Sequence, residues 1–483
     1  MSLTINPTIF DHCLFKLPPE LVPSWRSLGT IVELMSLKCC QSSFIISIED
    51  WTTILSDSLS ITPLLAKSMF YSFAEVSDSL ITQTTAALPP LALLLSIQPF
   101  YRSGNILSAR AMGAEAWPSR EARTSPIETI TADAITPSNL DTYRHSFITS
   151  NLTSMLSLVF RVFAACEITP TAALIADSID VLFEENPITI NNIVQNVTLK
   201  SDPQAVADVI LGQISSSVKQ CQIFSDLSKK ALILKQKDLK RCNISIFNCR
   251  RLFIVIMGHI DSIVISNCEQ CTVFVGAVRH ATITSSIKSS LSMTCRLIRV
   301  DNSSEIVSNV HCYLYPVVSM NCHRLIFGPF NSFYPSLLID MSSISLSPIL
   351  NKDYWKEPLG DVSSFKLEPP DTHIPFVVPF SDTDVEEFKN SSIDTSLLSG
   401  DLKSADVQNL LCTTCPVPLP SSFASDIKSR AELFQSIRAM TLDLKGDEKG
   451  KVERAVHSVF SEWLTSTGRA RIIHDLVAAE LEE

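Results

Sequence analysis

The middle of the chain repeats a short alternation of apolar and polar residues. Residues 244–249 are followed nineteen residues later by residues 263–268, and a third copy, residues 282–286, comes eighteen to nineteen residues after that. Each copy precedes a second alternating stretch. These stretches are residues 252–256, 271–275 and 290–294. Alternation with a period of two is typical of strands, and a repeat of this length with two short strands predicts stacked coils.

Such stacking predicts a right-handed parallel β-helix of about five coils. Every other side chain of a coil points inward, so Ile, Val and Cys at matching positions are expected to form interior ladders. Ile265 is one inward position, and Cys268 is expected to lie against Cys249. One coil cannot bury its own inner face, so several must stack and both ends need covers. The flanking helices are the natural covers.

Residues 1–235 are predicted to be helices joined by proline-containing loops. One buried helical face is indicated by apolar residues at three- and four-residue spacing. These residues are Leu152, Met155, Leu156, Val159, Phe160 and Phe163. A weaker pattern of the same kind consists of Ala205, Val206, Val209, Ile210 and Ile214. Residues 117–138 are rich in Ser, Thr, Pro and charged residues, which predicts a loop.

The chain is predicted to leave the coils after Met341. Strands are expected at residues 365–367 and 374–378, packed along the coil face. Residues 381–401 contain six acids, one lysine and many serines. This composition indicates a solvated linker, because such a segment cannot bury enough apolar surface to fold.

Apolar residues from Val452 to Leu464 indicate an amphipathic helix that ends near Gly468, and a second helix is expected at residues 472–481. The predicted fold class is therefore α and β multidomain. The predicted domains are 1–235, a helical N-terminal region; 236–345, the β-helix; 346–380, a β extension; 381–425, the acidic, serine-rich linker; and 426–483, the C-terminal helices.

Composition and charge narrow the class of protein. Apolar residues make up 46% of the 483 residues and charged residues 18%, which is typical of folded domains. The formal net charge is −11 and no basic stripe is present, so nucleic acid is not an expected partner. One basic cluster is interpreted as a solvated face around a helix. Its members are Lys229, Lys230, Lys235, Lys237, Lys240, Arg241, Arg250 and Arg251.

The chain is expected to be a soluble cytoplasmic protein. Its first residues lack the basic start of a signal peptide, so the fourteen cysteines are expected to remain mostly free thiols in a reducing compartment. The most apolar run, residues 86–97, is expected to be broken by Pro89 and Pro90 and is shorter than the roughly 20 residues that a membrane-spanning helix needs. No transmembrane segment is therefore predicted.

Several motifs around the coils resemble those of a known family. Phe-Gly-Pro-Phe-Asn-Ser-Phe-Tyr-Pro at 327–335 closes the coils, and Ser-Glu-Trp-Leu-Thr-Ser-Thr-Gly stands at 461–468. The other motifs are Glu-Ala-Trp-Pro at 115–118, Tyr354-Trp355, Leu-Glu-Pro-Pro at 367–370 and Phe-Val-Val-Pro-Phe at 376–380. From about residue 110 to about residue 477 the chain is similar to the C-CAP/cofactor C-like family. Within that family it resembles the TBCC domain-containing proteins, which are related to tubulin cofactor C.

This resemblance implies a non-catalytic cytoskeletal protein of the centrosome, spindle pole or basal body. Such a protein helps to position the centrosome and the Golgi, and its partners are centrosomal or tubulin-related proteins. The implied location is the cytoplasm, at a microtubule organizing center. Binding of actin monomers, as by other C-CAP domains, is a weaker alternative because the helical flanks match a different relative.

The resemblance also raises a catalytic alternative. Tubulin cofactor C and the related retinitis-pigmentosa protein stimulate GTP hydrolysis with an arginine in a Cys-Gln-Gln-Leu-Arg setting. Residues 295–299, Cys-Arg-Leu-Ile-Arg, match this segment, so Arg299 is a candidate arginine finger toward tubulin or an Arf-like GTPase. Arg296 and Leu297 replace the two glutamines. A guanidinium there would neutralise charge on the transferring phosphoryl group. The simpler alternative is an outward arginine that solvates a coil edge or binds a partner's carboxylate.

No cofactor or metal is expected. Two Cys-x-x-Cys pairs are present, Cys268/Cys271 and Cys412/Cys415. A structural zinc site needs four ligands, however, and Cys268 is better explained as an interior position.

Arg296, Arg299 and Trp463 are the candidate partner-binding residues. The helix that carries Trp463 either fills a groove on a partner, as aromatic anchors at helical spacing do, or docks on the chain's own β-helix.

Overall fold

The computed structural model describes residues 3–466 with several gaps. The gaps are residues 16, 18–22, 40–43, 104–136, 185–186, 196–201, 219–220, 240–242, 320, 377, 379–414 and 443–446. The chain divides into two units, Met1–Cys221 and Gln222–Glu483. Several predictions concern segments outside the described residues: nearly all of the loop 117–138, the acidic stretch 381–401, Cys412 and the helix 472–481.

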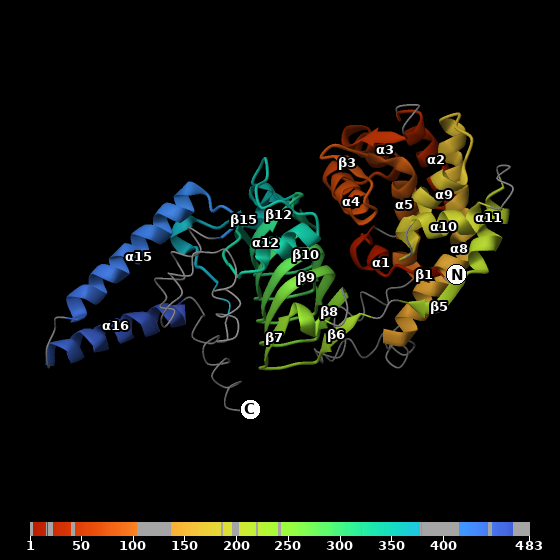
Figure 1. The fold of residues 1–483 in the computed structure, drawn as a ribbon. Coiled ribbons are helices and arrows are strands. Elements are labelled where there is room, and N and C mark those ends of the chain that lie inside the picture. The colour runs from red at the N-terminus through yellow and green to blue at the C-terminus, as the bar shows by residue number, and fades with distance from the viewer. Residues whose placement is uncertain are drawn as a thin grey trace, which may run out of the picture. The chain divides into compact units, whose positions relative to one another are not determined.

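The first unit is mainly helical, as predicted (Figure 1). Its helices are α1 (Thr8–His12), α2 (Trp25–Ser36), α3 (Ile48–Leu59), α4 (Pro63–Val76), α5 (Leu88–Ser103), α8 (Pro137–Ala165), α9 (Ala172–Ile179), α10 (Pro187–Val194) and α11 (Pro203–Leu211). Two small sheets, which the sequence did not predict, join its segments. One pairs β1 (Leu3–Ile5) with β5 (Ile214–Val218), and the other contains β2 (Ile45–Ser47), β3 (Leu80–Thr82) and β4 (Thr85–Ala87).

Helix α8 forms the centre of this unit, and its predicted apolar face is confirmed. Leu152, Met155 and Val159 are fully buried, and Phe163 is nearly so. Residues Arg144–Ala165 of α8 are long and apolar enough to cross a membrane by length and composition alone. Half of the helix's most apolar 18-residue window is buried inside the protein.

Helix α5 contains the apolar run that Pro89 and Pro90 were expected to interrupt. The two prolines instead stand in its first turn, directly after Leu88. A proline is tolerated there because its missing N–H has no partner inside the helix. The helix therefore begins at the prolines rather than ending at them.

The second unit contains the predicted parallel β-helix. Its strands are β6 (Gln222–Ser225), β7 (Ala231–Lys235), β8 (Asn243–Phe247), β9 (Phe253–Ser266), β10 (Thr272–Thr284), β11 (Ser290–Asp301), β12 (Val307–Cys312), β13 (Val317–Val318), β14 (Leu325–Pro329) and β15 (Phe365–Leu367). They pair in parallel, coil upon coil. The predicted start at residue 236 is too late, because β6 and β7 already form a coil that pairs with β8 and β9. Of the described members of the basic cluster, Lys237 lies in a single 3-10 turn (Gln236–Asp238), and the others lie on strand β7 or at the corners before β7 and β9.

One corner of each coil is built from two residues with left-handed backbone, three positions apart. Asn248 and Arg251 form such a corner, as do Asn267 and Gln270. The described residues contain six corners of this kind, one more than the five predicted coils. The others are Asp226/Lys229, Ser285/Lys288, Asn302/Glu305 and Asn321/Arg324. Asn, Asp and Ser tolerate this conformation and hydrogen-bond locally, and Asn267 Nδ2 donates to Asn248 Oδ1 at 2.6 Å.

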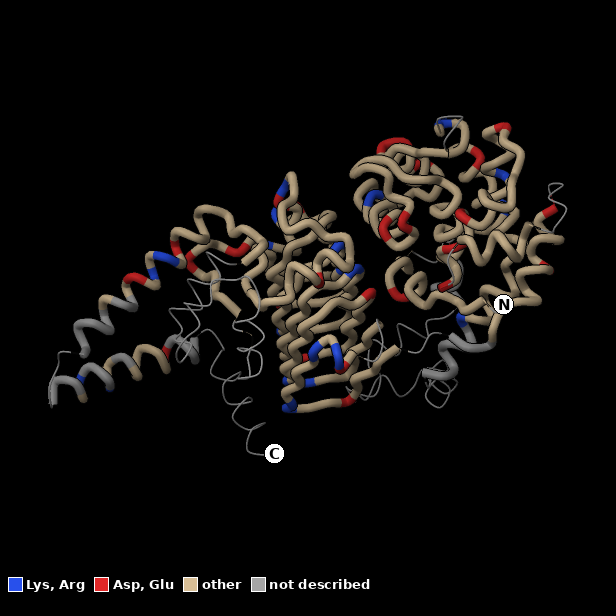
Figure 2. Tube along the Cα trace, viewed as in Figure 1, with Lys and Arg blue, Asp and Glu red and all other residues tan. Residues whose placement is uncertain are grey.

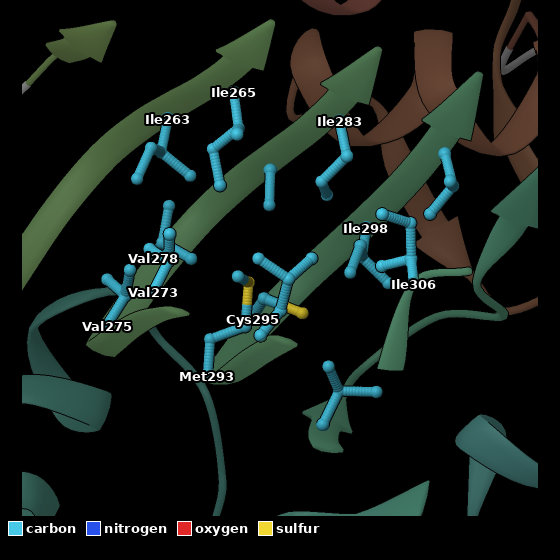
Figure 3. Close-up of a cluster of buried hydrophobic side chains, with 14 of the residues drawn as sticks. Ile263, Ile265, Val273, Val275, Val278, Ile283, Met293, Cys295, Ile298 and Ile306 are labelled. Carbon is cyan, nitrogen blue, oxygen red and sulfur yellow. The ribbon is translucent and has the colours of Figure 1, made fainter. Parts of the chain in front are cut away.

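The interior of the coils is the predicted ladder of aliphatic and thiol side chains. Ile265 is fully buried and lies in register between Ile246 and Ile283. Figure 3 shows Ile263, Ile265 and Ile283 on neighbouring strands, within one interior. Cys249 and Cys268 are both buried in the same interior cluster, which confirms the predicted interior position of Cys268.

A second apolar cluster covers the outer face of β9 and β10. Figure 1 shows α12, which contacts both strands, beside them. Helix α12 (Leu337–Ser343) contributes Leu337 and Met341. Phe376 stacks on Phe274 with ring centroids 5.3 Å apart. In place of the strand predicted at 374–378, the described residues of this segment form a single β-bridge, between Phe376 and Ser332. The strand predicted at 365–367 is confirmed as β15, which pairs with β14.

Two long helices follow, α15 (Ser421–Leu442) and α16 (Asp447–Ser466). Helix α15 starts inside the segment that was predicted to be linker. Its first turns bury Phe423 and Ile427, and Phe423 packs against Trp355. This apolar contact at the C-terminal end of the coils explains why the helix begins there and why the linker ends before residue 425. Helix α16 contains the predicted Val452–Leu464 segment.

Candidate functional site

Arg299, the candidate arginine finger, lies on β11 and is only 5% exposed. Its neighbours in sequence, Ile298 and Val300, point into the coil interior, so Arg299 projects from the opposite face of the strand. Its Nη2 lies 2.6 Å from Oδ2 of Asp301, and both side chains are largely shielded from solvent. The guanidinium therefore already has a carboxylate partner within the same coil.

The coils on either side form the surroundings of Arg299. Its register partners are Thr282 on β10 and Val317 on β13, and both are buried. His280, two residues before Thr282, is also buried. An arginine finger must reach a phosphate on another protein. Breaking a buried ion pair costs about 3–5 kcal/mol, so Arg299 would have to leave Asp301 against that cost.

Arg296 is held by different groups. Its Nη1 donates to the carbonyl oxygen of Ser345 at 3.0 Å, and its guanidinium lies over the ring of Tyr313, 4.8 Å from the centroid. These contacts fasten the segment after α12 to the coil. Arg296 and Arg299 are close in sequence, but each stabilises a different part of the domain.

Trp463 lies in α16, but its side chain is outside what the structure describes. Two nearby apolar residues on the same helix, Val459 and Phe460, are exposed. A joint role of Trp463 with Arg296 and Arg299 in partner binding stays a prediction.

The cysteines of the first Cys-x-x-Cys pair face the coil interior. Cys268 and Cys271 are both buried. Hydrogen bonds with Cys249 and Cys271, together with burial, raise the pKa of Cys268 well above its usual value, which favours the protonated thiol over the thiolate that zinc binds. Cys415 is half-buried, and its thiol lies 3.5 Å from the carbonyl oxygen of Ser332. Among the described residues, no group of three or more His, Cys, Asp or Glu side chains is arranged to hold a metal ion.

The sequence analysis did not predict Asp301 as the partner of Arg299, although the spacing of the two residues indicates it. Residues two apart on a strand share a face, so an acid two positions after Arg299 was a predictable partner. Its carboxylate decides whether the guanidinium is available. The relevant feature is therefore the pair and not the arginine alone.

A buried polar network joins two of the family motifs. Glu368, in Leu-Glu-Pro-Pro, accepts hydrogen bonds from Asn309 Nδ2 at 2.6 Å and pairs with His373 Nδ1 at 2.8 Å. A methyl group at Gly328, in the coil-closing motif, would overlap the Glu368 carboxylate. The ring of His373 packs against Phe423 of α15. The absence of a side chain at Gly328 thus leaves room for the Glu368 carboxylate against the last coil. The network holds the segment that follows the last coil in place.

The same coil-closing motif forms a second set of buried hydrogen bonds. The hydroxyl of Tyr334 donates to Asp340 Oδ2 at 2.8 Å, and burial raises the pKa of Tyr334 well above its usual value. Asn331 accepts a hydrogen bond from Ser292 Oγ at 2.6 Å and donates to the carbonyl oxygen of Ile374 at 2.8 Å. These motif residues hold α12 and the following segment on the coils. Their role in the described residues is structural.

Comparison with known proteins agrees with this architecture. Residues 241–360 match the family model described as Tubulin binding cofactor C. The chain is 23% identical over 274 residues to TBCC domain-containing protein 1 of Gallus gallus, with 55% of this chain and 44% of that protein covered. It is 22% identical over 267 residues to the protein of the same name from Homo sapiens, with 53% and 42% covered.

The similarity to these relatives is longer than the family-model match, since it covers more than half of this chain. The matched region spans less than half of the length of either relative. Strands β8 to β14 and the closing motif lie within the residues of the family match, whereas β6, β7 and the Glu368–His373 pair of the buried network lie outside it. Residues 241–360 therefore match a TBCC domain in sequence and in their coiled fold, and over about half of its length the chain is similar to TBCC domain-containing proteins.

Proposed function

We propose that this chain is a non-enzymatic cytoskeletal protein of the centrosome or basal body. It contributes to centrosome and Golgi positioning through protein–protein contacts of its β-helix. The observation that carries the proposal is the pairing of Arg299 with Asp301 within a TBCC-type β-helix. The domain keeps the scaffold of its family, while the one side chain associated with catalysis is engaged internally.

The scaffold suits a binding role. Stacked coils bury Ile, Val and Cys in register, and two apolar clusters fix the coils and the segments packed on them. A rigid surface loses little conformational entropy on association, so more of the contact energy is available for affinity. The proposed partners are centrosomal or tubulin-related proteins in the cytoplasm.

Localisation of a tagged copy in ciliated cells tests this proposal. The wild-type chain should concentrate at centrosomes or basal bodies. Arg299→Ala should localise in the same way, because the proposal assigns the arginine no catalytic role. A uniform cytosolic signal from folded wild-type protein would contradict it.

The second candidate function is activation of GTP hydrolysis on tubulin or an Arf-like GTPase. It is favoured by one observation, the presence of an arginine at the position of the family's finger. GTP hydrolysis by each GTPase should be measured with wild type, Arg299→Ala and Asp301→Asn. If the finger acts, wild type stimulates hydrolysis, Arg299→Ala abolishes the effect and Asp301→Asn increases it. The absence of stimulation by both wild type and Asp301→Asn removes this candidate.

A further inference from the structure

The first coil ends the β-helix with an edge strand. Within the described residues, β7 has a strand neighbour on one side only, β9. The N–H of Phe253 donates to the carbonyl oxygen of Lys230 at 2.9 Å, so alternate residues of this segment bond to β9. The main-chain groups of Ala231 and Ile233 are therefore directed to the open side. The N–H of Lys235 is directed there too, but it donates to Asp238 Oδ2 at 3.0 Å.

The side chains of β7 leave apolar surface for a further strand. Leu232 and Leu234 pack on the coil core yet remain only partly buried, because no further described coil covers them. Ile233, on the outer face, is 47% exposed. An exposed edge strand with free main-chain groups is a template for an additional strand.

Lysines surround this edge on both sides. Lys229 and Lys230 precede β7 and Lys237 follows it, and all three are exposed. Figure 2 shows Lys and Arg gathered on these first coils. A second copy of the same edge would bring lysines against lysines, which disfavours pairing between copies. A strand that carries acids opposite the lysines would be attracted.

We propose that the edge of β7 binds an acidic, extended peptide segment of a partner protein by strand addition. Apolar residues of that segment would cover Leu232 and Leu234, and acids would lie near the lysines. The inference rests on the proposed function only in treating the chain as an interaction protein. It names the chemistry of one class of partner and a surface separate from Arg299.

Binding of a labelled acetyl-(Glu-Val)5-amide peptide to the full chain, measured by fluorescence anisotropy, tests the proposal. Binding should be saturable and should weaken as salt is raised, because exposed charges are screened. An acetyl-(Lys-Val)5-amide peptide should not bind. Absence of acidic-peptide binding by folded wild type overturns the proposal.

Charge variants test the role of the lysines. The double variant Lys229→Glu with Lys230→Glu should weaken binding about tenfold, the sum expected for a few exposed ion pairs. Lys288→Glu is the matched control, since Lys288 is exposed and has the same left-handed corner position as Lys229, but in an inner coil. This control should change the affinity by less than about twofold. Equal losses from both variants would contradict a site at β7.

A backbone variant tests strand addition itself. Ile233→Pro removes an N–H that is directed to the open side and leaves the bonds to β9 in place, a position where an edge strand tolerates proline. It should abolish peptide binding, whereas Ile233→Val should retain it, and circular dichroism should show both variants folded. Wild-type affinity in Ile233→Pro would reduce the site to a basic patch and overturn strand addition.

Two further outcomes assign the edge to a different occupant and also overturn the proposal. One is self-association of wild type in sedimentation that Ile233→Pro abolishes. The other is binding to phosphatidylserine vesicles without binding to the peptide. The peptide assay is independent of localisation, so failure of this inference and failure of the proposed cellular role can be distinguished.

Discussion

Substitution of Ile265 by Asp tests the assignment of the coil interior. Ile265 is fully buried between Ile246 and Ile283 in the neighbouring coils. A carboxylate there loses its hydration and has no designed partner, which costs several kcal/mol. A domain is typically stable by about 5–15 kcal/mol, so this cost is comparable with the whole stability of the β-helix. Ile265→Asp should therefore abolish its cooperative unfolding.

The adjacent residue provides the matched control. Val264 belongs to the same strand but points to the outer face, where it is only partly buried. Val264→Asp should cost less than about 2 kcal/mol, and Ile265→Val about 1 kcal/mol. Thermal unfolding followed by far-UV circular dichroism would measure the loss of stability. Hydrogen exchange of β9 and β10 would show that the β-helix is the part that is destabilised.

The pH dependence distinguishes buried charge from lost packing. In the folded chain the introduced carboxyl would have a raised pKa, so its penalty should be smallest near pH 4 and grow as pH rises above the unfolded value of about 3.9. The reasoning would be refuted if Ile265→Asp melted like wild type, or if Val264→Asp were equally disruptive. Either result would mean that the inner and outer faces are exchanged.

Three further predictions concern other buried groups. Burial raises the pKa of Asp180 to about 7, so wild type should lose stability as pH rises from about 4 to 7; Asp180→Asn should melt higher than wild type at pH 8 and equally at pH 4. Gly328→Ala should destabilise the β-helix by about 1–3 kcal/mol in chemical denaturation, whereas Gly450→Ala, in open space, should not. Tyr334→Phe should cost about 1–3 kcal/mol, because it removes the hydroxyl donor to buried Asp340.

The β-helix could be predicted because its signal is local and repeated. Inward residues such as Ile246, Ile265 and Ile283 recur at nearly constant spacing, and a strand alternates regardless of what covers it. The first coil was missed because the lysines around β7 obscure its alternation. They are compatible with an edge strand and would be unfavourable in an inner one. Sequence alone did not distinguish an edge strand from a solvated helix.

Most of the site could not be predicted, because its contacts join distant parts of the chain. Glu368 meets Asn309 across fifty-nine residues, and α15 begins where Phe423 finds an apolar surface near Trp355. Composition around Ser421 gave no sign of that surface. Asp301 is the exception, since its partner is two residues away on the same strand. A periodic sequence pattern predicts a contact only when the two residues lie close together in the sequence.

The family motifs and Arg299, the candidate arginine finger, indicate different properties of the chain. Gly328, Tyr334 and Glu368 stabilise the packing of the domain. Their presence therefore indicates the fold and says nothing about action on a nucleotide. The chemistry at Arg299 depends instead on one carboxylate, that of Asp301, which the motifs do not contain. The similarity of this chain to TBCC domain-containing proteins therefore indicates the architecture of the coils and not the chemistry at Arg299. Stimulation of GTP hydrolysis has to be decided from the partner of the arginine.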